Sequence, residues 1–194
     1  MRVLRKVRHA LRCEKGVAAV EFALVLLPVC TLIMGSIEIG YRIYAMSVID
    51  GALRDATRMA STGQYTGPQI DAMVTDTIHT FRSSMNVTIV KKSYASFTGV
   101  GVAEPITSGS IASGHYCYQD INGNGQWDAD QGANGLGNPD DVVYYQVTAS
   151  YPTLFGFTQP ILGIGSTTTV SANTLVSNEP YAPPVVNQPP TNCV

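Results

Sequence analysis

The stretch that decides the fold runs from residue 16 to residue 37 and reads Gly16-Val-Ala-Ala-Val-Glu21-Phe22-Ala-Leu-Val-Leu-Leu-Pro28-Val-Cys-Thr-Leu-Ile-Met-Gly35-Ser-Ile37. Six basic residues precede it: Arg2, Arg5, Lys6, Arg8, Arg12 and Lys15. At about 1.5 Å per residue, a helix from Val17 to Ile37 covers the ~30 Å core of a bilayer. Lys and Arg beside an apolar segment stay on the cytoplasmic side. The sequence therefore predicts one membrane span, with its N-terminus inside and the rest of the chain exported.

The acid within this stretch does not prevent insertion. Twelve Leu, Ile, Val or Phe residues lie between Val17 and Ile39. Together they contribute about −4 to −7 kcal/mol, whereas a charge at mid-membrane costs about +2.5 to +3.5 kcal/mol. Glu21 lies near the cytoplasmic end, where the cost is lower. Pro28 removes one helical hydrogen bond, so we expect a kink or a local loosening there.

An acid inside a membrane is a functional hypothesis that needs a partner. If the chain is cut between Gly16 and Val17, Val17 gains a positive amine, and the Glu21 of one subunit can pair with the amine of its neighbour. Such a pair fixes the axial register of packed subunits. Alternatively, Glu21 reaches the headgroups or is protonated. An ordinary secretory signal peptide and an uncleaved signal anchor are the rival interpretations of the whole stretch.

The segment Gly16-Val-Ala-Ala-Val-Glu21-Phe22, behind a short basic leader, resembles the TadE-like pseudopilins of the Tad/Flp tight-adherence pilus system. The resemblance implies cleavage after Gly16 by a prepilin peptidase, with Glu21 and Phe22 as assembly and register residues. It also implies other pilin or pseudopilin subunits and the Tad inner-membrane assembly platform as partners, and surface adhesion and biofilm formation as the process served. The expected location is the bacterial inner membrane, single-pass with the C-terminal domain periplasmic, or the extracellular pilus.

The charge of the chain is unevenly distributed. Residues 1–16 hold six of the twelve basic residues and one of the fourteen acids, so the remainder carries a net charge of −7. No Lys or Arg follows Lys92, whereas seven acids do. This distribution argues against binding to nucleic acid or to anionic lipid. It favours divalent cations or a basic partner surface.

The four cysteines divide between compartments. Cys13 leaves with the leader and Cys30 lies in the membrane helix. Cys117 and Cys193 are exported, and an even pair in an oxidising compartment predicts a disulfide that holds the C-terminal tail. Two unpaired thiols, or a bond to another chain, are the alternatives.

The pattern of the remaining chain predicts an α+β fold, in which a long helix from residue 17 to 61 packs on a small antiparallel sheet. We expect a leader (1–16), a transmembrane helix (17–40), its amphipathic continuation (41–62), an exported domain (63–181) and a proline-rich extended tail (182–194). The stripe Met46, Ile49, Leu53, Ala56 and Ala60 has helical spacing. A second helix is expected from Pro68 to Phe81. Strands are expected at 87–94, 142–151 and 166–176, which are rich in β-branched and aromatic residues. The segments Val142-Val-Tyr-Tyr, Tyr151-Pro152 and Asn178-Glu-Pro-Tyr181 extend the resemblance to TadE-like proteins.

The loop from residue 118 to 141 carries oxygen side chains at the spacing of a calcium loop. Asp120, Asn122 and Asn124 fit the first three ligand positions, Gly125 fits the sharp turn, and the Gln126 carbonyl and Asp128 fit the next two. The last position, which should be an acid, is Gln131, with Asp130 one residue early. A structural calcium ion is the candidate cofactor. The alternative is a hydrated loop rich in turns.

Catalytic motifs are lacking in the sequence, so we expect no enzyme. Paired acids, His79 and His115 are isolated surface or half-buried groups. Two hypotheses remain: a pseudopilin or minor pilin that is a substrate of the prepilin peptidase, and a signal-anchored, calcium-dependent binding module that does not polymerise.

Overall fold

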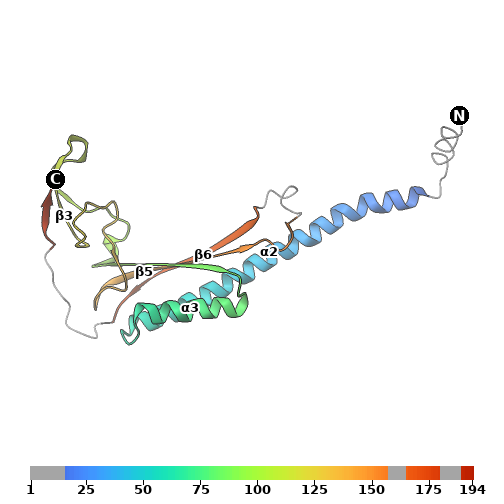
Figure 1. The fold of residues 1–194 in the computed structure, drawn as a ribbon, viewed down its shortest axis with the longest axis horizontal. Helices are drawn as coiled ribbons and strands as arrows, with labels where there is room; N and C mark the ends of the chain where they lie inside the picture. The colour runs from blue at the N-terminus through green and yellow to red at the C-terminus, as the bar shows by residue number, and fades with distance from the viewer. Residues whose placement is uncertain (1–15, 157–164, 180–188) are drawn as a thin grey trace. The chain divides into compact units, whose positions relative to one another are not determined.

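The computed structural model describes residues 16–156, 165–179 and 189–194. Residues 1–15, 157–164 and 180–188, which include nearly all of the expected leader and most of the proline-rich tail, lie outside the described residues. The chain forms two compact units. The first comprises the chain up to Arg42 together with Pro152–Ser166, and the second comprises Ile43–Tyr151 with Thr167–Val194. Figure 1 shows the elements of each unit along the chain.

The long helix α2 spans Val17–Ser61 and contributes to both units. It is long and apolar enough to cross a membrane, and the 18-residue window that qualifies it is not buried at all. The helix continues through Pro28, so this proline does not end it. One turn later, the hydroxyl of Thr31 donates to the carbonyl of Leu27 at 2.8 Å. This is the usual bond of a helical threonine to the carbonyl four residues earlier, and it does not replace the bond to Leu24 that Pro28 removes.

The second half of α2 has one buried face. Its buried apolar residues are Ala45, Ile49, Ala52, Leu53, Ala56 and Ala60. The expected stripe is thus correct except at its first member, because Met46 is 46% exposed and Ala45 takes the buried place. Four of the six residues are alanines, whose short side chains allow close packing of this face.

The helix α3 spans Gly67–Phe81, which matches the helix expected from Pro68 to Phe81, and buries Ile70, Val74 and Ile78. At its start, the side chain of Gln69 accepts a hydrogen bond from the amide of Thr66 at 2.9 Å, which closes a capping box. At its end, the ring of Phe81 meets that of Tyr44 on α2 edge to face at 5.1 Å. This contact joins the two helices.

The larger sheet has the strand order β4-β1-β5-β6. Its strands are β1 (Asn86–Tyr94), β4 (Ala133–Asn134), β5 (Val142–Pro152) and β6 (Thr167–Ser177). The central pair, β1 and β5, is antiparallel from Asn86 opposite Ser150 to Tyr94 opposite Val142. Alternate residues of β5 are buried, as period-2 patterning requires. Together with α2, this sheet confirms the expected α+β class.

A second, three-stranded sheet was not expected. Its order is β2-β3-β7, with β2 at Ile106–Ser110, β3 at His115–Gln119 and β7 at Thr191–Cys193. Two short 3-10 turns, η2 (Phe97–Gly99) and η3 (Ile111–Ser113), lie on either side of β2. The end of the tail, which was expected to be extended, forms the strand β7, whose pairing with β3 the sequence did not indicate. No apolar alternation marks β2, whose five residues are all exposed.

Candidate functional site

The predicted cleavage position lies at the start of α2. The helix begins at Val17, directly after Gly16, and nothing lies within 4 Å of where a Cβ on Gly16 would stand. Val17 is 52% exposed and Phe22 is 66% exposed, and Glu21 is exposed as well. Within the described residues, the predicted cleavage and register residues therefore lie on an accessible helix end.

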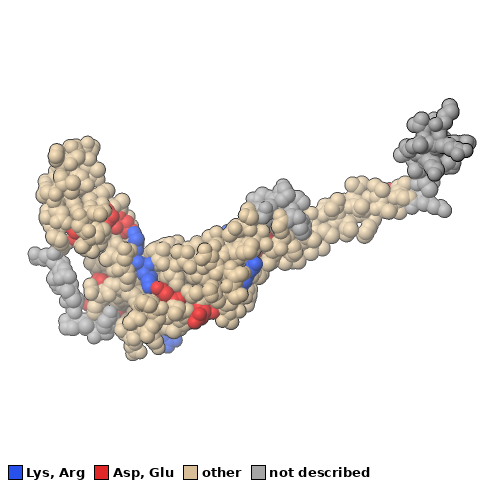
Figure 2. All heavy atoms as spheres, in the orientation of Figure 1, with Lys and Arg blue, Asp and Glu red and all other residues tan. Residues whose placement is uncertain are grey.

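The first half of α2 presents apolar side chains around its circumference. The large apolar residues exposed there are Val17, Val20, Phe22, Leu24, Val25, Leu26, Leu27, Val29, Leu32, Ile33, Ile37, Ile39 and Ile43. On the face drawn in Figure 2, the part of α2 nearest the N-terminus shows only uncharged residues. A helix that is apolar on all sides is covered by lipid or by other helices.

The predicted calcium loop folds around Asp120, which is 3% exposed. One carboxylate oxygen accepts from the amide of Asn124 at 3.0 Å, and the other accepts from the amide of Gly125 at 2.8 Å. The side-chain amide of Asn192, on β7, donates to the same carboxylate at 3.1 Å. The loop is thus attached to the C-terminal strand through a buried acid.

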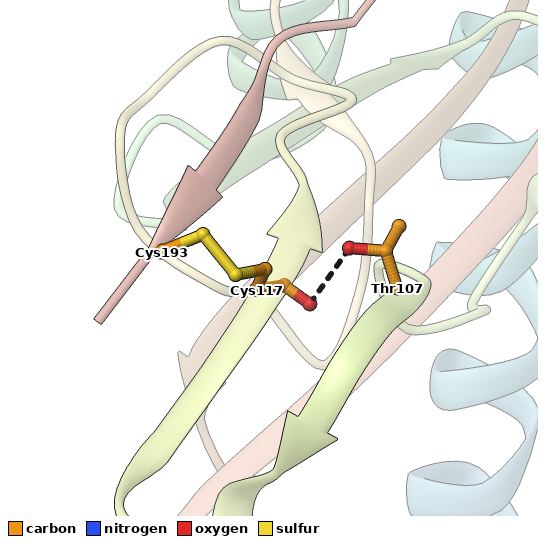
Figure 3. The surroundings of a disulfide bond; sticks show 3 residues. All are labelled: Thr107, Cys117 and Cys193. Carbon is orange, nitrogen blue, oxygen red and sulfur yellow. Dashed lines mark hydrogen bonds between the residues drawn. A yellow bond between two sulfur atoms is a disulfide. The ribbon is translucent and has the colours of Figure 1, made fainter.

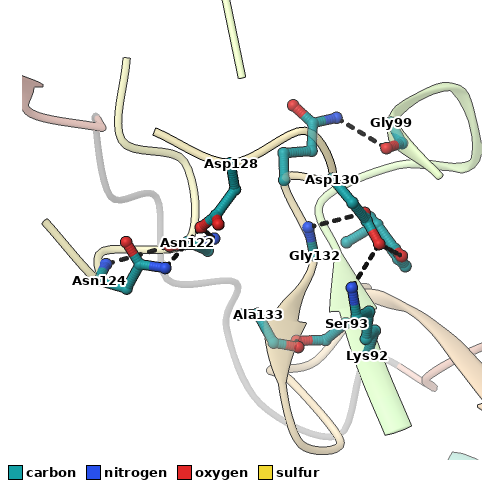
Figure 4. A network of polar contacts seen from close by, with 11 residues as sticks. Lys92, Ser93, Gly99, Asn122, Asn124, Asp128, Asp130, Gly132 and Ala133 are labelled. Atoms are coloured by element: carbon teal, nitrogen blue, oxygen red, sulfur yellow. Dashed lines mark hydrogen bonds and ion pairs between the residues drawn. The ribbon is translucent and has the colours of Figure 1, made fainter. Parts of the chain in front are cut away.

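The next three candidate ligands surround the same turn (Figure 4). Asp128 accepts from the side-chain amides of Asn122 and Asn124 at 2.8 and 2.5 Å. The Asn122 oxygen accepts from the amide of Asn124, and the Asn124 oxygen accepts from the amide of Gln126. Five of the six predicted ligand residues therefore lie in one hydrogen-bonded turn, where donors of the loop occupy their oxygens.

The sixth predicted ligand residue, Asp130, faces a different partner. It forms an ion pair with Lys92 and accepts from the hydroxyl of Tyr94 at 3.2 Å. Burial raises the pKa of Asp130, but hydrogen bonds from Lys92 and Tyr94 outweigh it, so that the net pKa lies below the ordinary value. Burial and the neighbouring Asp130 raise the pKa of Tyr94 to about 12. Gln131, at the twelfth loop position, donates instead to the carbonyl of Gly99.

A cavity of about 330 Å³ lies between the turn that holds Asp128 and the ion pair of Lys92 with Asp130. Its wall includes Lys92, Asn122, Asn124, Asp128 and Asp130. Among the residues that the structure describes, no group of three or more His, Cys, Asp or Glu is gathered as a metal site. Calcium binding by the mixed Asp, Asn and main-chain set stays a prediction.

Sequence reasoning missed the residue that organises this loop, Glu104. It is 2% exposed, and its carboxylate accepts from the amides of Ile121 at 2.8 Å and Asp128 at 3.1 Å. Its carbonyl accepts from the indole of Trp127 at 2.9 Å. Glu104 lies 16 residues before Asp120 and outside any motif. The one signal in the sequence is that it is the single acid between Lys92 and Asp120.

Cys117 on β3 is bonded to Cys193 on β7 (Figure 3), the pair that the cysteine count indicated. The two residues lie opposite each other in the antiparallel register. The hydroxyl of Thr107 on β2 donates to the carbonyl of Cys117 at 3.2 Å. The disulfide therefore fastens the end of the chain to the small sheet.

The two histidines among the described residues, His79 on α3 and His115 on β3, have different surroundings. His79 donates from its ring to the carbonyl of Met85 at 3.1 Å, and His115 is exposed on β3. His79 therefore links the end of α3 to Met85, which directly precedes β1.

Comparison with protein families finds one match, to the model described as TadE-like protein, over residues 16–58. The match covers less than a quarter of the 194 residues, and it includes Gly16, Glu21 and most of α2. TadE-like proteins are not an enzyme family. Neither the curated proteins nor the solved structures gave a match. The similarity of this N-terminal segment, with its one helix that fits a single-pass anchor, is consistent with a TadE-like protein of the Tad pilus system.

Proposed function

We propose that this chain is a pseudopilin, or minor pilin, subunit of a Tad pilus that serves surface adhesion and biofilm formation. It is made as a prepilin with its N-terminus in the cytoplasm and its exported unit in the periplasm. A prepilin peptidase cuts it between Gly16 and Val17, and α2 then packs with the helices of other pilin or pseudopilin subunits on the Tad inner-membrane platform.

The observation that carries this proposal is the exposed first half of α2. The helix begins at Val17, the residue that cleavage would expose, and its apolar surface is unburied over the qualifying window. Lipid covers this surface in the membrane, and neighbouring helices cover it in a filament. A helix that served only as a membrane anchor would need to contact lipid but not the helices of other subunits.

Glu21 supplies the reason to pack with other subunits. It lies four residues after Val17, about 6 Å along the helix axis. In a neighbour displaced by that amount, the new amine of Val17 and the carboxylate of Glu21 lie at the same level. An ion pair in hydrocarbon is strongly favoured over either charge alone. The pair thus sets the axial offset between adjacent subunits.

Replacement of Glu21 by Gln tests the proposal, because it removes the charge and keeps the shape. We expect Glu21→Gln to abolish pili, counted by electron microscopy, while the protein stays in the membrane and is still cleaved. Gly16→Ala should block cleavage and retain the mass of residues 1–16. Asp50→Asn, which removes an exposed acid from the second half of the same helix, is the matched control. Normal pilus numbers in Glu21→Gln would contradict the proposed register role.

The second candidate, an anchored calcium-dependent module, is favoured by one observation. The turn around Asp120 places three Asx side chains and the Gln126 backbone together, in the order that a calcium loop requires. If the loop takes calcium, added Ca²⁺ should raise the Tm of the full chain in detergent, and Asp120→Asn should remove the increase. An unchanged Tm at millimolar Ca²⁺ would dismiss this candidate and leave the pseudopilin proposal intact.

A further inference from the structure

The first unit contains a contact that the pseudopilin role does not use. Glu38, on α2, is 4% exposed although it follows the apolar stretch directly. Its carboxylate accepts from the backbone amide of Leu154, at 3.1 Å to the nearer oxygen. Leu154 belongs to the turn Thr153–Gly156 that follows β5. The carboxylate of Glu38 is therefore hydrogen-bonded to a turn that lies more than a hundred residues later in the chain.

The length of α2 gives the depth of this contact in a membrane. If the span begins at Val17, the 21 residues to Glu38 rise about 31 Å, which is close to the thickness of the hydrocarbon core. Glu38 then lies at the boundary between acyl chains and headgroups. Because the turn is bonded to Glu38, it lies at the same depth.

The face of α2 that carries Glu38 is also covered farther inside the span. Gly35 is buried, and Cys30 and Met34 are only half-exposed, while most of their neighbours on the helix are exposed. Cys30 precedes Glu38 by eight residues, or about 12 Å. The covered face therefore begins within the expected hydrocarbon and ends at its outer boundary. Besides the chain up to Arg42, the first compact unit contains the segment Pro152–Ser166.

The composition of the segment Pro152–Ser166 is compatible with contact to lipid. Between Pro152 and Ser166 the sequence has no charged residue. Leu154 is 38% exposed, and Phe155 is half-exposed. On the helix side, Ile39 follows Glu38 directly and is 59% exposed, and Tyr41 lies one turn after Glu38 on nearly the same face of α2. Aromatic and aliphatic side chains at the end of a span are typical of the membrane interface.

We propose that the turn Thr153–Gly156 lies in the interface of the same membrane that α2 spans, with Leu154 and Phe155 in contact with phospholipid. The turn shields the carboxylate of Glu38 from hydrocarbon and attaches the β5–β6 connection to the membrane surface. This inference rests on the proposed function only in taking α2 as a membrane span. It requires neither cleavage at Gly16 nor entry into a filament.

Quenching of tryptophan fluorescence by brominated phospholipid tests the proposal in nanodiscs that hold one full-length chain. The native tryptophan is first removed by Trp127→Phe. In this background, Leu154→Trp is compared with Leu175→Trp, because these two leucines are similarly exposed, at 38% and 42%. Leu175 lies on β6, nine residues after Ser166 or about 30 Å along an extended strand. Bromines near the headgroups should quench the tryptophan at 154 several-fold more than that at 175.

Phe22→Trp in the same background separates failure of this inference from failure of the proposed span. Phe22 is 66% exposed on α2, so a tryptophan there should be quenched by lipid bromines if the helix is inserted. Quenching at 22 without quenching at 154 would overturn the inference alone. Absence of quenching at 22 would overturn both. Equal quenching at 154 and 175 would also overturn it, because the whole exported unit would then lie on the lipid.

Replacement of Glu38 by Ala tests the attachment itself. It removes the acceptor for the amide of Leu154 and leaves the apolar side chains of the turn in place. We expect quenching at Leu154→Trp to fall in Glu38→Ala, while quenching at Phe22→Trp stays the same. Unchanged quenching at 154 would show that the turn contacts lipid without this hydrogen bond, and it would contradict the shielding role of Glu38.

Discussion

Two regions of this chain are built on different physical principles. The second half of α2, with α3 and the larger sheet, is held by apolar side chains that repeat with the period of their element. The region from Phe97 to Gly132, with the small sheet, is held by buried polar groups and a disulfide, and its apolar pattern is weak. The comparison shows that one domain can depend on hydrophobic burial in one part and on satisfied buried polar atoms in another.

The largest effect should come from the apolar region. Ile49→Ala should lower the free energy of unfolding by about 4 kcal/mol, because Ile49 is fully buried and truncation leaves a cavity. Ile33→Ala is the matched control, since Ile33 lies on the same helix and is 55% exposed. It should change the free energy by less than about 0.5 kcal/mol. Urea unfolding of the full chain in detergent, followed by circular dichroism, measures both, and equal losses would break the comparison.

The next effect should come from the disulfide of the polar region. The bond joins residues that are 76 positions apart, and its removal in the pair Cys117→Ser and Cys193→Ser should cost about 3 kcal/mol, which is typical of a single disulfide. Cys30→Ser is the control, because Cys30 is a free cysteine on α2. Thermal unfolding under non-reducing conditions gives the two values. An unchanged Tm in the double variant would mean that the small sheet is stable without its covalent link.

Glu104 should rank third. Glu104→Gln replaces one of the two accepting carboxylate oxygens with an NH2 donor, which then faces a backbone amide that needs an acceptor, so we expect a loss of about 2 kcal/mol. The Trp127 indole donates to the backbone carbonyl of Glu104, so its emission should shift when the loop rearranges around the substituted side chain. Glu179→Gln, which removes an exposed acid, is the control. It should change neither the free energy of unfolding nor the Trp127 emission. If Glu104→Gln unfolds like the wild type, the loop does not depend on buried polar contacts.

The smallest effect should be that of Asp130, and it depends on pH. Its pKa is lowered from an ordinary 3.8, so the folded state favours the carboxylate. Its contribution is therefore complete above that value and is lost as the pH falls through the lowered pKa. Asp130→Asn should cost at most about 1 kcal/mol at neutral pH, because the pair with Lys92 is partly exposed. The difference from wild type should shrink below about pH 3.8; a difference that grows on acidification would contradict the pairing.

The same division explains what could be predicted from the sequence. The second half of α2 and the central strand β5 follow from periodicity, because one buried face imposes a repeat on the residues that form it. The first half of α2 follows instead from the length of its apolar run. The buried place of Ala45 rather than Met46 did not follow, since positions four and three residues before the buried Ile49 both lie near its face of the helix, and only packing decides between them.

In the polar region, the Asp and Asn residues of the turn could be predicted from the sequence, but Glu104, which accepts hydrogen bonds from the backbone of the turn, could not. Glu104 acts through bonds to backbone amides, which every residue type carries, so no spacing identifies its partners. The strands β2 and β7 were missed for a similar reason. They are short, exposed edge strands whose place depends on β3 and on the Cys117–Cys193 bond rather than on their own composition.

The central claim is that the functional chain begins where α2 begins. Sequencing the first residues of the protein purified from its native membranes tests this most directly. The account predicts Val-Ala-Ala-Val-Glu, starting at Val17. A chain that still begins with Met1, or one that begins beyond Ile37, would contradict it.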